Sequence, residues 1–71
     1  MDLKLTHGVE HGTDKGKDGT YQAYIKDDDT GEFIWAGFIV DSEEKAQGEH
    51  DDAMKLVRYI AEKLNATVID D

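Results

Sequence analysis

Two segments rich in aromatic and β-branched residues, joined by a short acidic stretch, constrain the fold of this chain most. Residues 21–26 read Tyr-Gln-Ala-Tyr-Ile-Lys and residues 33–40 read Phe-Ile-Trp-Ala-Gly-Phe-Ile-Val, a composition that favours strands. The stretch between them reads Asp-Asp-Asp-Thr-Gly-Glu, in which aspartates can bond their own backbone and Gly31 can adopt a positive φ. The sequence therefore predicts an antiparallel hairpin over residues 21–40.

The second strand of this hairpin is apolar on both faces. In a regular strand, Phe33, Trp35 and Ile39 lie on one face and Ile34, Ala36, Phe38 and Val40 on the other. One helix covers only one face, so we expect the other to be covered by the N-terminal segment, by a second copy of the chain or by a partner. An intermolecular contact is favoured, with a homodimer through the uncovered sheet face. The hairpin register decides which set faces outward.

A helical repeat of apolar residues follows toward the C-terminus. From Ala53 to Leu64, apolar residues recur at spacings of four, three and four, which predicts one helix over residues 51–64. Asn65 is a suitable left-handed stop. Residues 66–69 then predict a short strand that pairs in parallel with an earlier strand, because the helix makes the crossover.

The start of the chain predicts an edge strand and a loop. Residues 3–6 alternate like a strand, whereas glycines interrupt the sequence after them. We expect the glycine-rich segment 7–19 to be a mobile loop. The fold class is therefore α+β, as a single domain over residues 1–71. It comprises a small antiparallel sheet of three to four strands with one C-terminal helix packed on one face.

Length and residue usage limit the class of protein. A chain of 71 residues without cysteine leaves room for one small core and for neither disulfides nor thiolate metal sites. No apolar run is long enough for a membrane-spanning helix or a signal peptide. We expect a cytoplasmic protein.

The charge is strongly acidic and unevenly distributed. The chain has 17 acidic and 8 basic side chains, a formal net charge of -9. Its excess lies in residues 27–52, where Lys45 is the one base. The acids of this stretch are Asp27, Asp28, Asp29, Glu32, Asp41, Glu43, Glu44, Glu49, Asp51 and Asp52. Such a field opposes binding to nucleic acid or to an anionic membrane and favours a basic partner.

The residues that usually carry catalysis or metal binding give no strong pattern. The one serine, Ser42, lies among acids that would oppose a developing negative charge. His7 and His11 are spaced for a helix, but Gly8 and Gly12 disfavour a helix there. We therefore predict no enzyme, no cofactor and no metal site. Zinc binding through His7, His11 and His50 stays open as a third alternative.

Two parts of the chain resemble the core of HicB-type antitoxins. They are residues 21–33, with the acidic hairpin turn, and the step Gln47-Gly48-Glu49-His50-Asp51-Asp52-Ala53 with the amphipathic helix after it. The resemblance covers residues 21–64 and implies a partial RNase H-like fold with a turn at Gly48. It also implies that the chain binds and silences a small basic RNA-cleaving toxin without catalysis of its own.

These observations predict a non-catalytic acidic binding protein, inhibitor or antitoxin-like, whose partner is a basic nucleic-acid-handling protein. The predicted contact residues are Asp27, Asp28, Asp29 and Glu32 in the turn, Asp41, Glu43, Glu44 and Glu49 after the second strand, and exposed Tyr24. The acids would stand in for phosphates, as in a nucleic-acid mimic; small phage anti-defence inhibitors share this profile. The alternative is a small dimerising structural module whose acids serve solubility only.

Overall fold

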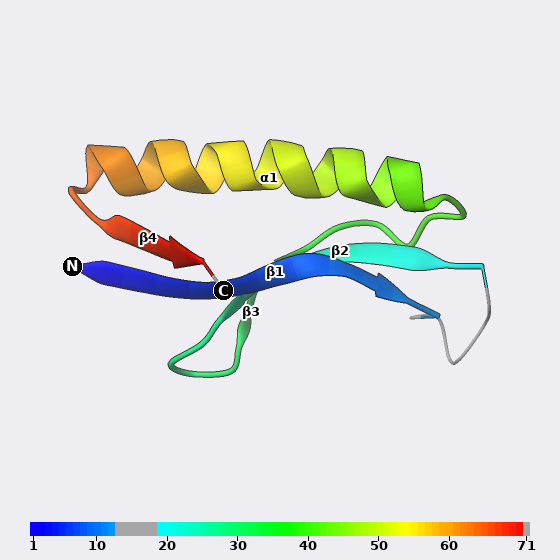
Figure 1. The fold of residues 1–71 in the computed structure, drawn as a ribbon, viewed down its shortest axis with the longest axis horizontal. Helices are drawn as coiled ribbons and strands as arrows, with labels where there is room; N and C mark the ends of the chain where they lie inside the picture. Colours follow the sequence, from blue (N-terminus) through cyan, green and yellow to red (C-terminus); the bar gives the residue numbers. More distant parts are fainter. Residues whose placement is uncertain (13–18, 71) are drawn as a thin grey trace.

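Four strands and one helix form the fold in this computed structural model, which describes residues 1–12 and 19–70. Their order is β1 (Asp2–His11), β2 (Tyr21–Asp27), β3 (Phe33–Ala36), α1 (Glu43–Lys63) and β4 (Thr67–Asp70). The sheet order is β3-β2-β1-β4, and α1 runs along one face of the sheet (Figure 1). The predicted α+β class, with a four-stranded sheet and a C-terminal helix, is confirmed.

The turn of the hairpin between β2 and β3 forms as predicted. Gly31 has a φ of 76°, and its N–H donates to the carbonyl of Asp27 at 2.8 Å. The side chain of Asp27 accepts from the N–H of Asp29 at 2.8 Å, which is the local aspartate bond that the sequence indicated. The strands pair antiparallel.

The second strand is shorter than predicted. β3 ends at Ala36 instead of residue 40, and its pairing with β2 shifts register at Ile25 and Lys26. Beyond it, one isolated bridge joins Tyr21 to Val40. The regular alternation expected through residue 40 is therefore wrong, because a register shift re-aims the side chains around it.

β1 is longer than predicted and lies inside the sheet. Its pairing with antiparallel β2 runs from Leu5 opposite Asp27 to His11 opposite Tyr21, and its other edge pairs with parallel β4. The prediction of an edge strand is thus wrong, because β1 pairs with β2 along one edge and with β4 along the other. The predicted loop is wrong for residues 7–11, because pairing with β2 outweighs the local effect of Gly8. Residues 13–18 of the expected loop lie outside the described residues.

The helix begins at Glu43 rather than near residue 51. Ser42 caps it, because its side chain accepts from the N–H of Lys45 at 3.4 Å. Gly48, which the resemblance places in a turn, lies inside α1 with open space where a Cβ would stand. At the other end, Asn65 has a φ of 56°, so the predicted left-handed stop is confirmed.

A small core lies between α1 and the middle of the sheet. Leu5 and Ile25 are fully buried and Met54 is 5% exposed. Leu3, Trp35, Ala53, Val57 and Val68 pack partly buried around them. β4 returns from the helix to pair in parallel with β1, as predicted for the C-terminal strand.

Candidate functional site

The turn acids, Asp27, Asp28, Asp29 and Glu32, lie together at the β2–β3 turn, with Asp27 as the last residue of β2. Asp28, Asp29 and Glu32 are exposed. Asp28 accepts a hydrogen bond from the hydroxyl of Thr6 on β1, which holds the turn against the sheet. Among the described residues, the ion pairs that form involve none of these four acids.

The helix-start acids, Asp41, Glu43 and Glu44, gather where α1 begins. Lys45 donates to Asp41 at 3.0 Å, and this contact lowers the pKa of the exposed Asp41 carboxyl through a hydrogen bond and a charge. His11 Nε2 lies 3.8 Å from Glu43 Oε2. Glu43 and Glu44 also lie at the end of α1 where the helix dipole favours negative charge.

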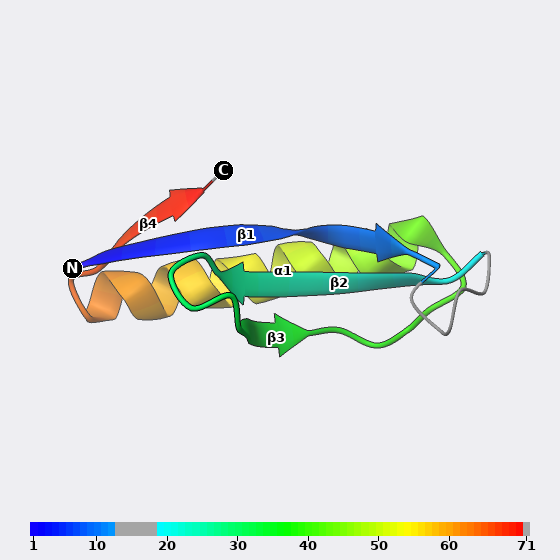
Figure 2. The same ribbon diagram turned by 90° about the horizontal axis from the view of Figure 1, so that it is seen from below.

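The two groups of acids lie apart along the molecule. Figure 2 shows the β2–β3 turn well separated from the start of α1, along a body that measures 40 × 22 × 16 Å. The structure therefore does not gather the predicted contact acids into one pocket. Glu49, predicted with the second group, lies further along α1 and lines a groove described below.

Tyr24 lies on the sheet face opposite the helix and is half-buried rather than exposed as predicted, because its ring packs against Phe33. Its ring meets Phe33 edge-on, with centroids 6.2 Å apart. The pairing register places a mostly polar set on the same face, namely Lys4, Thr6, Gln22 and Lys26. The face that the sequence marked for an apolar contact is thus mainly polar, apart from the Tyr24–Phe33 pair and Ile69.

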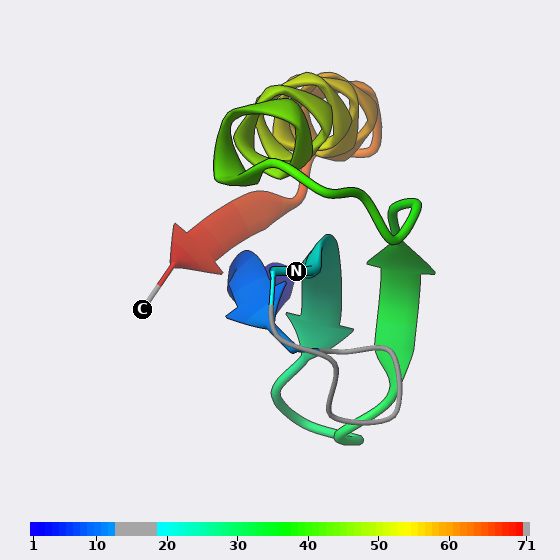
Figure 3. The ribbon, with the colours of Figure 1, turned by 90° about the vertical axis from the view of Figure 1, so that its right-hand side faces the viewer.

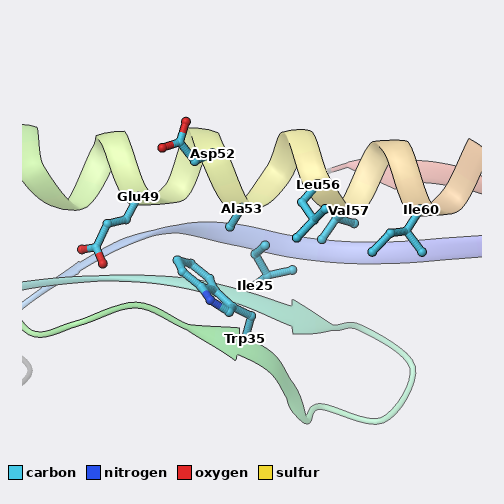
Figure 4. A pocket seen from close by; sticks show the side chains of 8 residues that line it. All are labelled: Ile25, Trp35, Glu49, Asp52, Ala53, Leu56, Val57 and Ile60. Atoms are coloured by element: carbon cyan, nitrogen blue, oxygen red, sulfur yellow. The ribbon is translucent and has the colours of Figure 1, made fainter.

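Half of the large exposed apolar side chains among the described residues, five of ten, lie instead beside the helix. They line a groove between α1 and β3 that we call the α1–β3 groove. Its first part has a volume of about 460 Å³ and is lined by Ile25, Trp35, Glu49, Asp52, Ala53, Leu56, Val57 and Ile60 (Figure 4). A second part of about 300 Å³ shares Val57 and Ile60 and is lined further by Met1, Leu3, Ile34, Ala61, Leu64 and Ala66. The two parts therefore form one continuous apolar surface along α1.

Two carboxylates border one end of this groove. Glu49 points from α1 toward the sheet, whereas Asp52 directs its carboxylate away from it (Figure 4). Glu49 Oε1 accepts from the N–H of Phe38 at 3.3 Å. Its other oxygen is buried and has no hydrogen-bond partner within the part of the chain that the structure describes. Burial of such an atom is costly.

Two of the three histidines form a stacked pair between α1 and β1, on the side of α1 that faces the sheet. His7 Nδ1 lies 2.7 Å from His50 Nε2, and the rings stack with centroids 4.9 Å apart. His50 Nδ1 lies 3.0 Å from Asp51 Oδ1, so this nitrogen donates while Nε2 accepts from His7. His11 instead packs edge-on against Tyr21. Across residues 1–12 and 19–70, no cluster of three ligand-type side chains could hold a metal ion.

Comparison with known proteins adds no relative: no family model, curated protein or solved structure matches the chain. Within the described residues, no helix is both long and apolar enough to cross a membrane.

The α1–β3 groove was not predicted from the sequence. The signal was present in the helix, where Leu56, Ile60 and Leu64 widen the apolar stripe beyond what packing on one sheet face requires.

Proposed function

We propose that the chain is a non-catalytic acidic binding protein, of the inhibitor or antitoxin-like kind, that engages a basic nucleic-acid-handling protein. The observation that carries the proposal is the group of turn acids. Asp28, Asp29 and Glu32 are exposed, and none of the four takes part in the ion pairs between described residues. Their charge therefore stays available to a partner. We place the protein in the cytoplasm as part of the same proposal.

Two separated acid groups suit an extended basic surface better than a single ion. The turn acids would bind at one place in the partner's nucleic-acid-binding groove and the helix-start acids at another. They would occupy the positions that phosphates of the nucleic acid take. Such complementarity raises the association rate and excludes acidic partners. Tyr24 and Phe33 lie beside each other on the sheet face next to the turn and would add apolar contact area.

The resemblance to HicB-type antitoxins narrows the partner to a small basic RNA-cleaving toxin. Under this proposal the chain silences the toxin by covering its basic RNA-binding surface, without catalysis of its own. The resemblance carries this step alone.

A matched pair of charge-reversal variants tests the proposal. Asp29→Lys, Glu32→Lys and Glu44→Lys together reverse exposed acids of the two groups. Asp2→Lys, Glu10→Lys and Glu62→Lys reverse the same number of exposed acids elsewhere. Each protein is immobilised and exposed to host lysate at low and high salt, and the captured proteins are identified by mass spectrometry.

We expect the wild type and the second variant to capture the same basic protein at low salt, and the first variant to lose it. The purified partner should then lose its nucleic-acid-binding or cleaving activity when the wild type is added. If both variants capture equally well, the acids serve solubility only and the alternative of a plain structural module holds. A partner that is itself acidic would also contradict the proposal.

A further inference from the structure

The sheet is wider than the helix that covers it. Four strands spaced about 4.8 Å apart need more cover than one helix, whose diameter with side chains is about 10 Å. Accordingly α1 packs on β1, β2 and β4 but makes no comparable set of contacts with β3. Figure 3, seen along the helix, shows β3 to one side of the layer that α1 covers. The α1–β3 groove lies at this position, beside α1 and lined from below by side chains of β3.

The side of α1 that faces this space carries an apolar ridge. Leu56 is 59% exposed and Ile60 is 47% exposed, and their spacing of four places them on one ridge. Trp35 and Ile34 from β3 line the groove beneath. A helix laid here with a similar ridge would interdigitate with them.

Charges at the two ends of the ridge favour one particular occupant. Glu49 and Asp52 lie one to two turns before Leu56, whereas Lys63 lies about one turn after Ile60. Lys63 is exposed, and its Nζ lies over the ring of Tyr59, 5.2 Å from the ring centroid. The ion pairs between described residues do not include it. The ridge is therefore negative at one end and positive at the other.

An antiparallel second copy of α1 matches this order of charges. A two-fold axis halfway between Leu56 and Ile60 sets each Leu56 beside the other copy's Ile60. It also sets each Lys63 opposite the other copy's Ala53, next to Asp52 and within one turn of Glu49. A parallel pairing would instead bring like charges together at both ends. The contact is self-complementary, as a closed dimer requires.

We infer that the α1–β3 groove binds the α1 helix of a second copy of this chain, antiparallel, with Leu56 and Ile60 at the centre and Lys63 against Glu49 and Asp52 at both ends. The dimer covers the apolar side chains that the single chain exposes along α1. It also places a cation near Glu49, one of whose oxygens has no hydrogen-bond partner among the described residues. This interface replaces the sheet face, which is mainly polar, and it is independent of the turn acids and helix-start acids.

Sedimentation equilibrium of the full chain tests the inference directly. We expect a monomer–dimer equilibrium, and a red shift of the emission of Trp35, the single tryptophan, as dilution opens the groove. Ile60→Asp should weaken the dimer by about a hundredfold, because it places a charge at the centre of the contact. Circular dichroism checks that this variant folds, which we expect because Ile60 is half exposed. A wild type that stays monomeric at high concentration overturns the inference.

A charge swap tests the antiparallel orientation. Lys63→Glu alone and Asp52→Lys alone should each weaken the homodimer by about tenfold. An equimolar mixture of the two variants should form a heterodimer of wild-type strength, because each contact again joins opposite charges. Lys55→Glu makes the same change in charge outside the groove lining and should leave the dimer unchanged. A dimer that ignores Ile60→Asp, or a mixture no tighter than its components, contradicts the proposed interface.

Discussion

The two flanks of α1 carry similar apolar residues, which are buried on one flank and exposed on the other. On the inner flank, Met54 and Ala61 are buried against the sheet, at 5% and 4% exposure. On the outer flank, Leu56 and Leu64 remain 59% and 65% exposed. The residue types do not explain this difference. It arises because β1, β2 and β4 lie beneath the inner flank, whereas β3 stands clear of the outer one.

Buried polar groups lie on both flanks. On the inner flank, His50 is 8% exposed and hydrogen-bonded to both His7 and Asp51. On the outer flank, Glu49 keeps one carboxylate oxygen without a partner among the described residues. The outer flank differs because it exposes Leu56 and Leu64 beside its partly buried carboxylate, as interaction surfaces do.

The largest expected effect comes from comparing a leucine-to-alanine substitution beneath the inner flank with the same substitution on the outer flank. Leu5→Ala removes a fully buried side chain beneath the inner flank and should lower the free energy of unfolding by about 2–5 kcal/mol. Leu56→Ala on the outer flank should lower it by less than about 1 kcal/mol at a protein concentration low enough to keep the chain monomeric. Urea denaturation measures both. Equal losses would refute the division into two flanks.

The histidine pair offers the next largest effect. His50→Leu removes the contact between His7 Nδ1 and His50 Nε2 from a partly buried site, which should cost about 1–3 kcal/mol of stability. His11→Leu makes the same change at an exposed histidine and should cost about 0.5 kcal/mol or less. Thermal unfolding at neutral pH compares the two. A His50→Leu variant as stable as His11→Leu would show that the stacked pair does not stabilise the inner flank.

Substitution of two glycines by alanine should change the stability of the protein in opposite directions. Gly48→Ala should stabilise the protein by about 0.5–1 kcal/mol, because Gly48 lies inside α1 with open space around it. Gly31→Ala should destabilise it by a similar amount, about 1 kcal/mol, because Gly31 has a φ of 76°. Chemical denaturation again reports both changes. A loss of stability in Gly48→Ala would mean that the exposed side of α1 needs its glycine.

The smallest expected effect is a pH dependence from Asp51. Hydrogen bonds from His50 and then Gln47 lower the pKa of this exposed carboxyl. Its ionised form therefore stabilises the folded state at neutral pH, and this contribution is lost as the pH falls below about 4. Asp51→Asn should show a slightly shallower loss of stability on acidification than the wild type. Thermal melts between pH 5 and 2 would detect it, and parallel curves would exclude the contribution.

Local patterns predicted most of the fold. The turn of the hairpin followed from its aspartates and Gly31, and the end of α1 followed from Asn65, because these features depend on a few neighbouring residues. The start of α1 did not follow, since Gly48 interrupted the apolar repeat. The signal lay in the cap at Ser42 and in Ala46, which is buried at a spacing of four from His50.

Features set by distant pairing were beyond the sequence. β1 looked like an edge strand, but its second edge pairs with β4, which lies at the far end of the chain. The register shift at Ile25 and Lys26 changed which side chains of β3 share a face. For the candidate site, the positions of the acids in the turn and near the helix start were predictable. The groove was not, because a stripe of apolar residues does not reveal how much of it the sheet covers.

The shortness of β3 also limits how far copies of this chain can assemble. An exposed outer strand offers its free backbone groups to another molecule, and long flat strands of this kind promote open-ended stacking of sheets. β3 spans Phe33–Ala36 and its pairing with β2 is irregular, so it offers little backbone for a further strand. Self-association should therefore stop at a closed pair instead of growing into fibres.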